Sequence, residues 1–190
     1  MLEHERIALI LIATITGMMA FVVSTVAVPA GSTALTADAL IFVQHSISAG
    51  IALRISAGLK NYRWIVIVQG AVMMLLGALV CAIAVRRLMM GSFPHPVTMI
   101  LIGAAALAAH LSCCAIMLHA RGQLTSLEAL WRFGRNDAVG HIAVIAAAGT
   151  VAATRSNIPD LVIGAAMAGF FIISGWKLMT APGPDANQLR

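Results

Sequence analysis

Six apolar stretches are separated by short segments that carry charges, prolines and glycines. They cover residues 7–29, 34–57, 64–85, 96–119, 127–153 and 160–179. Each has roughly the 20 residues that a helix needs to cross a hydrocarbon layer about 30 Å thick. The alternating apolar and polar pattern of a membrane β-strand is absent, and Ala, Gly, Ile, Leu and Met dominate. The pattern predicts an all-α membrane protein built as a bundle of six transmembrane helices.

The composition leaves little room for a soluble part. The 190 residues are 61% hydrophobic and 10% charged, whereas an ordinary soluble domain is roughly 25% charged. The mean hydropathy of +0.96 agrees. We therefore assign residues 1–180 to one six-helix transmembrane domain. Residues 181–190 form a short, polar C-terminal tail that we expect to be loosely ordered.

The basic residues predict an orientation. If the N-terminus is cytoplasmic, nine of the 12 Lys and Arg residues fall on the cytoplasmic side and three on the other. We therefore expect both termini to be cytoplasmic. The first apolar run lacks a secretory cleavage site, which favours a bacterial inner membrane. The cytoplasmic group is Arg6, Arg54, Lys60, Arg63, Arg121, Arg132, Arg135, Lys177 and Arg190, and the other group is Arg86, Arg87 and Arg155.

Five ionisable residues are candidates for positions at membrane depth: Asp38, His45, His110, Asp137 and His141. Such groups are costly at membrane depth and tend to face a bundle interior or a wet cavity. For Asp38 we expect a helix-start position at the outer interface, because acids favour the first turn of a helix. His110 is expected to hydrogen-bond a neighbouring helix more readily than to bind metal. His45 and Asp137 form the most notable pair.

The remaining polar and small residues indicate packing. Gln44 and Gln69 are expected to bond between helices, and the small pair Gly164 and Ala168 is expected to allow close helix approach. No nucleophile–base set, phosphate loop or redox motif occurs, so an enzyme is not predicted. The net charge of +5 does not indicate nucleic-acid binding, because the basic residues lie at the ends of apolar runs. The three cysteines are expected to be small core residues: Cys81, Cys113 and Cys114.

Three stretches resemble the cation diffusion facilitator family, also called the cation efflux family. "LEALWRFGRNDAVGHIAVIAAAGTVAATRSNIPDLVIGAAMAGFFIISGWKLM" is similar to that family's helices 5 and 6. "RRLMMGSFPHPVTMILIGAAALAAHLSCCAIML" resembles its helix 3–4 connection and helix 4, and "STALTADALIFVQHSISAGIALRISA" resembles its helix 2. The likeness covers about residues 30–180 in order. It implies proton-coupled export of divalent cations, usually zinc.

The resemblance also implies a metal site between helices 2 and 5. The family takes two ligands from each helix, spaced i, i+4, and these positions fall on Ile41 and His45 and on Phe133 and Asp137. Two positions are therefore apolar, and a third carries an imidazole in place of a carboxylate. Zn²⁺ requires four ligands, so this set alone does not close a site. The family's C-terminal cytoplasmic domain is also absent from this chain.

Two interpretations of the site remain open. In one, a displaced metal site uses His45, Asp137 and His141, with His110 or a water as the fourth ligand. In the other, the site has decayed, and Asp137 is held by His45 or His141 as a structural contact.

Two functions follow from these interpretations. The first is efflux of a zinc-like divalent cation by proton-coupled antiport through an altered or displaced site. The second is a non-transporting membrane subunit on the same scaffold, which serves assembly or packing in a larger complex. We expect the lipid bilayer as surroundings, a divalent cation and protons as substrates, and a homo-oligomer or membrane-protein complex. No resident cofactor and no nucleic acid is expected.

Overall fold

The computed structural model describes residues 3–56, 63–120 and 125–181, without the side chains of residues 55–56 and 125–136. Within these ranges it contains helices and no strand, as the sequence predicts. The expected helix limits are confirmed to within a few residues, except that α3 continues past Arg86 and Arg87. The C-terminal tail assigned to 181–190 lies almost wholly outside the described residues. The helices are α1 (Glu3–Ala27), α2 (Thr33–Ser56), α3 (Arg63–Met90), α4 (Pro96–His119), α5 (Thr125–Thr154) and α6 (Ile158–Thr180).

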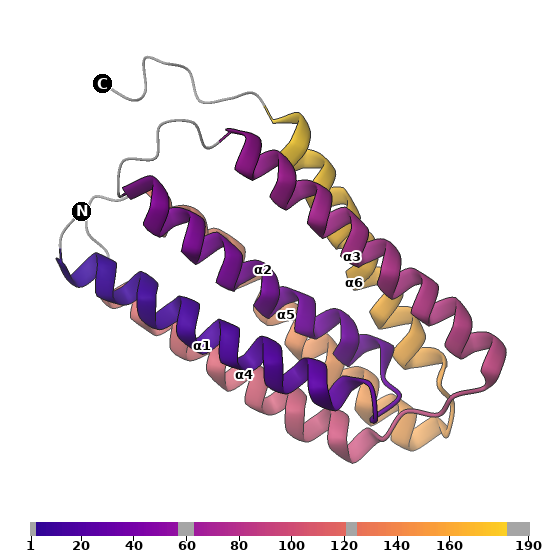
Figure 1. The fold of residues 1–190 in the computed structure, drawn as a ribbon. Helices are drawn as coiled ribbons and strands as arrows, with labels where there is room; N and C mark the ends of the chain where they lie inside the picture. Colours follow the sequence, from indigo (N-terminus) through magenta and orange to yellow (C-terminus); the bar gives the residue numbers. More distant parts are fainter. Residues whose placement is uncertain (1–2, 57–62, 121–124, 182–190) are drawn as a thin grey trace.

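The six helices form one bundle with two parts (Figure 1). Helices α1, α2, α4 and α5 lie together, with α1 against α2 and α4 against α5. Helices α3 and α6 lie side by side as a separate pair, and this pair contacts the rest mainly through α2 and α5. The start of α1 and the end of α6 lie at the same end of the bundle. α2 therefore occupies the centre, between the other helices of its own part and the α3–α6 pair.

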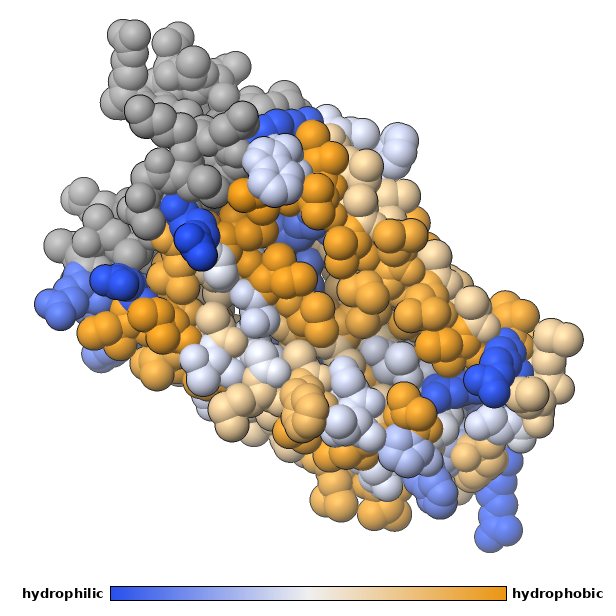
Figure 2. All heavy atoms as spheres, viewed as in Figure 1, coloured by the Kyte–Doolittle hydropathy of each residue, from blue (hydrophilic) through white to orange (hydrophobic). Residues whose placement is uncertain are grey.

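The outer surface of the bundle is apolar. Large side chains such as Met18, Phe21, Leu75 and Leu101 are 64–72% exposed. Figure 2 shows apolar residues over the length of the visible face, with the most hydrophilic residues gathered at its two ends. All six helices are long and apolar enough to cross a membrane. An exposed apolar surface of this extent is stable in lipid and not in water, so the chain has the build of a multi-pass membrane protein.

Glycines bring α3 and α6 into backbone contact. A Cβ placed on Gly70 would lie 2.6 Å from the carbonyl oxygen of Gly175, and one placed on Gly77 would lie 2.8 Å from that of Ala168. A Cβ on Gly164 would lie 2.8 Å from the carbonyl carbon of Thr33, which belongs to α2. The predicted packing role of Gly164 and Ala168 is therefore confirmed. Small residues hold α6 close to both α3 and α2, as is common between membrane helices.

Asp160, in the first turn of α6, caps the start of α2. Its carboxylate accepts hydrogen bonds from the Ser32 hydroxyl at 2.5 Å and from the backbone N–H groups of Thr33 at 2.7 Å and Ala34 at 3.1 Å. Arg87, near the end of α3, donates to the Thr33 hydroxyl at 3.2 Å. The first N–H groups of a helix have no partner inside it. The Ser32 hydroxyl caps α2 locally by accepting from the Leu35 N–H at 3.0 Å, and Asp160, 127 positions from Thr33, supplies the acceptors for the two N–H groups before it.

Candidate functional site

The bundle interior contains a close pair between α2 and α5. His45 Nε2 and Asp137 Oδ2 are 2.6 Å apart, and their side chains are 6% and 16% exposed. The expectation that α2 and α5 are neighbours, with these two residues turned inward, is confirmed. At this distance one proton is held between a ring nitrogen and a carboxylate oxygen, whichever group formally owns it.

A second pair joins the same two helices. His141 Nδ1 lies 2.7 Å from Asp38 Oδ1, and both side chains are fully buried. The expectation that Asp38 is a helix-start residue is wrong. Helix α2 begins at Thr33, so Asp38 lies in the second turn and faces the core. A fully buried carboxylate persists because an imidazole on the neighbouring helix supplies its hydrogen bond.

His110, on α4, lies between the two pairs. Its ring centroid is 5.2 Å from that of His45 and 4.9 Å from that of His141. Phe42 covers the other side, stacked on His141 with centroids 5.1 Å apart. The side chains of α2, α4 and α5 thus form a continuous line across the bundle, which runs Asp137, His45, His110, His141 and Asp38.

The structure brings the four expected metal ligands into one cluster. Asp137 bonds to His45, while His141 bonds to Asp38, which the expected set did not include. In the described part of the chain, no group of three or more His, Cys, Asp or Glu side chains has an arrangement that could hold a metal ion. Asp38 Oδ2 and His141 Nε2 are buried and have no hydrogen-bond partner there. The metal-binding role of these residues stays a prediction.

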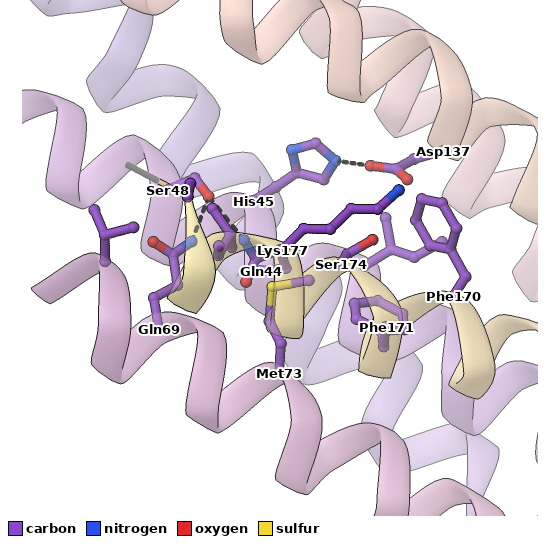
Figure 3. Close-up of a pocket in the computed structure, with 14 residues that line it drawn as sticks. Gln44, His45, Ser48, Gln69, Met73, Asp137, Phe170, Phe171, Ser174 and Lys177 are labelled. Carbon is purple, nitrogen blue, oxygen red and sulfur yellow. Dashed lines mark hydrogen bonds and ion pairs between the residues drawn. The ribbon is translucent and has the colours of Figure 1, made fainter. Parts of the chain in front are cut away.

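A cavity reaches the His45–Asp137 pair from the side of the α3–α6 pair (Figure 3). Its volume is about 420 Å³. The wall is mostly apolar, with polar groups at a few positions only. The polar lining residues are Gln44, His45, Ser48, Gln69, Asp137, Ser174 and Lys177, and the apolar ones include Ile41, Val66, Met73, Phe170, Phe171 and Leu178. A concave, mainly apolar space with few convergent polar groups is the usual form of a small-ligand site.

Two amides share one hydroxyl at the wall of this cavity. Gln69 on α3 donates to the Ser48 hydroxyl on α2 at 2.9 Å, and Gln44 donates to the same oxygen at 3.2 Å. The prediction that Gln69 bonds between helices is confirmed. Gln44, in contrast, bonds to Ser48 on its own helix, one turn away. These groups link the central helix to the α3–α6 pair beside the cavity.

Ile41 and Phe133 are the apolar residues at two of the positions where the resemblance implies metal ligands. Ile41 is 5% exposed and lines the cavity beside Asp137. Its Cδ1 would lie 3.0 Å from a Cβ placed on Gly140, so the branched side chain fills the space between α2 and α5. Phe133 belongs to α5, but its side chain lies outside the described residues.

The cysteines contribute to packing. Cys113 and Cys114 are buried in an apolar cluster with residues of α1 and α2, and Cys81 is partly buried. All three are free, as expected for small core residues in this kind of chain.

Sequence reasoning missed three polar residues of the cavity: Ser48, Ser174 and Lys177. Their helical spacing carries a usable signal. Ser48 lies one turn after Gln44 on α2, and Ser174 and Lys177 follow Phe170 at i+4 and i+7 on α6. Lys177 was counted only as a charge at a helix end.

No known protein family and no characterised protein matches this chain in sequence.

Proposed function

We propose that the chain is a membrane transporter that exchanges a zinc-like divalent cation for protons, with Asp137 and His45 as the central binding pair. Its resemblance to the cation diffusion facilitators supports this. The observation that carries the proposal is the position of the pair at the cavity wall, 2.6 Å apart. Ionisable groups at membrane depth usually mark the path of an ion or a proton.

The chemistry of the pair accounts for the coupling. A cation bound at this point needs the carboxylate oxygen and the imidazole nitrogen as lone-pair donors. The same two atoms hold a proton between them when the cation is absent. Cation and proton therefore compete for one place, which is the minimal requirement for exchange.

The cluster around this pair limits how tightly a cation is held. Asp137 and His45 supply two ligands, and water completes the coordination from the cavity side. The ring of His110 lies against His45, within the same cluster. His141 holds Asp38 through Nδ1, so only its Nε2, which has no hydrogen-bond partner among the described residues, is open to a metal. A site with two protein ligands binds weakly and releases readily, which suits transport better than storage.

The proposed orientation places both termini in the cytoplasm. Arg6 and Arg54 lie at the end of the bundle that carries the termini, whereas Arg86 and Arg155 belong to the other end. The excess of basic residues at the first end supports this direction, and an inner membrane of a bacterium is the proposed location. Single cysteines introduced at positions 60 and 190 should react with a membrane-impermeant maleimide only after the cells are opened. Labelling of either position in intact cells would contradict the orientation.

Transport is tested with the purified protein in proteoliposomes that enclose a zinc-sensitive dye. A pH gradient should drive zinc movement by the wild-type protein, and zinc entry should in turn move protons measured with a pH dye. Asp137→Asn should abolish both signals, because it removes the carboxylate of the pair. Thr150→Ala, which removes a hydroxyl bonded only to its own helix, is the matched control and should transport normally.

A second function is favoured by one observation. Ile41 stands where the family places a ligand and fills the space beside Asp137 with a group that has no lone pair. On this alternative the chain is a non-transporting subunit on the same scaffold, and the two Asp–His pairs only join α2 to α5. Folded wild-type protein that moves neither zinc nor protons would support this alternative and overturn the first.

A further inference from the structure

Lys177 lies in the last turn of α6, where a basic residue has an ordinary explanation. Cations near a helix C-terminus interact favourably with the helix dipole, and a long side chain can reach the membrane surface. Both effects operate from any face of the helix. They do not explain why Lys177 lines the cavity that contains Asp137.

The register of α6 places Lys177 on the cavity face. Phe170, Ser174 and Lys177 follow at i, i+4 and i+7, and all three line the cavity. Figure 3 shows the Lys177 side chain extended through the cavity toward Asp137 and Phe170, not away from them. Among the described lining residues, Asp137 is the acid and Lys177 the ammonium-bearing residue.

The two charges have an electrostatic consequence. Lys177 is exposed at the cavity wall, and among the described residues no ion pair joins it to Asp137, so the two charges attract each other across the cavity rather than in direct contact. A divalent cation that approaches Asp137 therefore meets a positive charge already present. It can bind closely only when the ammonium withdraws, and the flexible four-carbon stem of lysine permits this movement.

We infer that Lys177 is a tethered cation that occupies the neighbourhood of Asp137 in the empty cavity and must be displaced by the transported cation. This rests on the proposed function. Lys177 is thus a positioning residue for cation affinity and release. With it, the Asp137 carboxylate has His45 as its hydrogen-bonded partner and the ammonium as a second positive charge on the same cavity wall. Without it, the cation is held more tightly and released more slowly.

The first measurement is the zinc affinity of the purified full chain in detergent, determined by titration calorimetry. Lys177→Met keeps most of the side-chain length and removes the charge. It should bind zinc about tenfold more tightly than the wild type, since a repulsive unit charge leaves the cavity. Lys177→Arg should keep the weaker affinity. Arg54→Met removes an exposed charge at the same end of the bundle but outside the cavity lining, and should change nothing.

The second measurement needs no metal. The melting temperatures of Lys177→Met, Asp137→Asn and the double variant form a thermodynamic cycle. If the ammonium interacts with Asp137, the effect of Lys177→Met should be largely lost in the Asp137→Asn background.

The outcomes separate the two proposals. Additive effects in the cycle, or unchanged zinc affinity in Lys177→Met, would overturn the role of Lys177. The proposed function would still stand if the wild-type protein binds zinc. If neither the wild-type protein nor any variant binds zinc, the proposed function is overturned. The displacement of Lys177 by the cation is then overturned with it, even where the cycle still shows coupling. Tighter binding in Lys177→Met together with coupling would support the inference.

Discussion

Removal of the Asp160 carboxylate should destabilise the bundle more than any other single polar deletion at this end. The carboxylate is 1% exposed and accepts from the Ser32 hydroxyl and from the backbone N–H groups of Thr33 and Ala34. Asp160→Ala leaves these two N–H groups buried without an acceptor, because Thr33 and Ala34 are themselves fully buried. Each unsatisfied buried group costs about 1–3 kcal/mol, so the two groups together give an expected loss of about 2–6 kcal/mol.

Two further variants test whether the loss of stability comes from the Asp160 carboxylate itself. Asp160→Asn keeps one acceptor oxygen and should lose about 1–3 kcal/mol. Ser156→Ala is the matched control, because its hydroxyl accepts one exposed bond, from the Ile158 N–H at 3.2 Å. It should cost about 0.5–1 kcal/mol. The expected order of stability is therefore wild type, Ser156→Ala, Asp160→Asn and Asp160→Ala.

The assay is unfolding of the purified protein in mixed micelles with increasing SDS. Circular dichroism and tryptophan fluorescence report the folded fraction. The free energy of unfolding of each variant is compared with that of the wild type. If Asp160→Ala is no less stable than Ser156→Ala, the carboxylate does not hold α2 in place, and the role assigned to the cap is wrong.

Three other results are expected. Gly175→Ala should separate α3 from α6 and lower the melting temperature by several degrees, because its Cβ would lie 2.5 Å from a backbone oxygen, whereas Gly169→Ala, with open space around it, should be neutral or stabilising. His141→Ala should cost about 3–5 kcal/mol because it leaves the Asp38 carboxylate buried and unpaired, and joint replacement of both residues by Phe and Leu should recover most of that loss in the SDS assay. Zinc binding at Asp137 should weaken as the proton concentration rises, since a proton and the metal compete for the same lone pairs of the His45–Asp137 pair; calorimetry that finds an affinity independent of proton concentration would contradict the proposed site.

The sequence was sufficient to predict the helices, because membrane thickness and backbone satisfaction leave few alternatives. One boundary was wrong for a physical reason. Arg86 and Arg87 suggested that the third helix ends before them, yet α3 continues to Met90. A long side chain at a helix end can reach a polar partner, and Arg87 does so by donating to Thr33 on α2.

The site was predictable only in part. The pairing of His45 with Asp137 followed from the resemblance and from the cost of ionisable groups at this depth. The pairing of His141 with Asp38 could not be predicted in this way. Asp137 and His141 are one turn apart, about 6 Å along α5, so both face α2 but at different heights. Asp137 therefore contacts His45 on α2, and His141, one turn further along α5, contacts Asp38.

Asp38 and Asp160 were missed for the same reason. An acid near the start of an apolar stretch has the local pattern of a helix-start residue. The start of α2 is instead capped from α6 by Asp160, and Asp38 bonds to α5. Both partners are more than 100 positions away in the chain, and no local pattern encodes such a contact.

The two Asp–His pairs have nearly the same chemistry and geometry, but they differ in access. The distances are 2.6 and 2.7 Å, and both pairs join α2 to α5. Asp38 and His141 are fully buried, whereas the Asp137 side chain is 16% exposed and lines a cavity. Helices in lipid gain little from apolar contact with each other, so a sealed polar pair is well suited to hold them together. A pair that a solute can reach is suited to exchange ligands. Substitution at Asp38 should therefore lower stability first, and substitution at Asp137 should lower transport first.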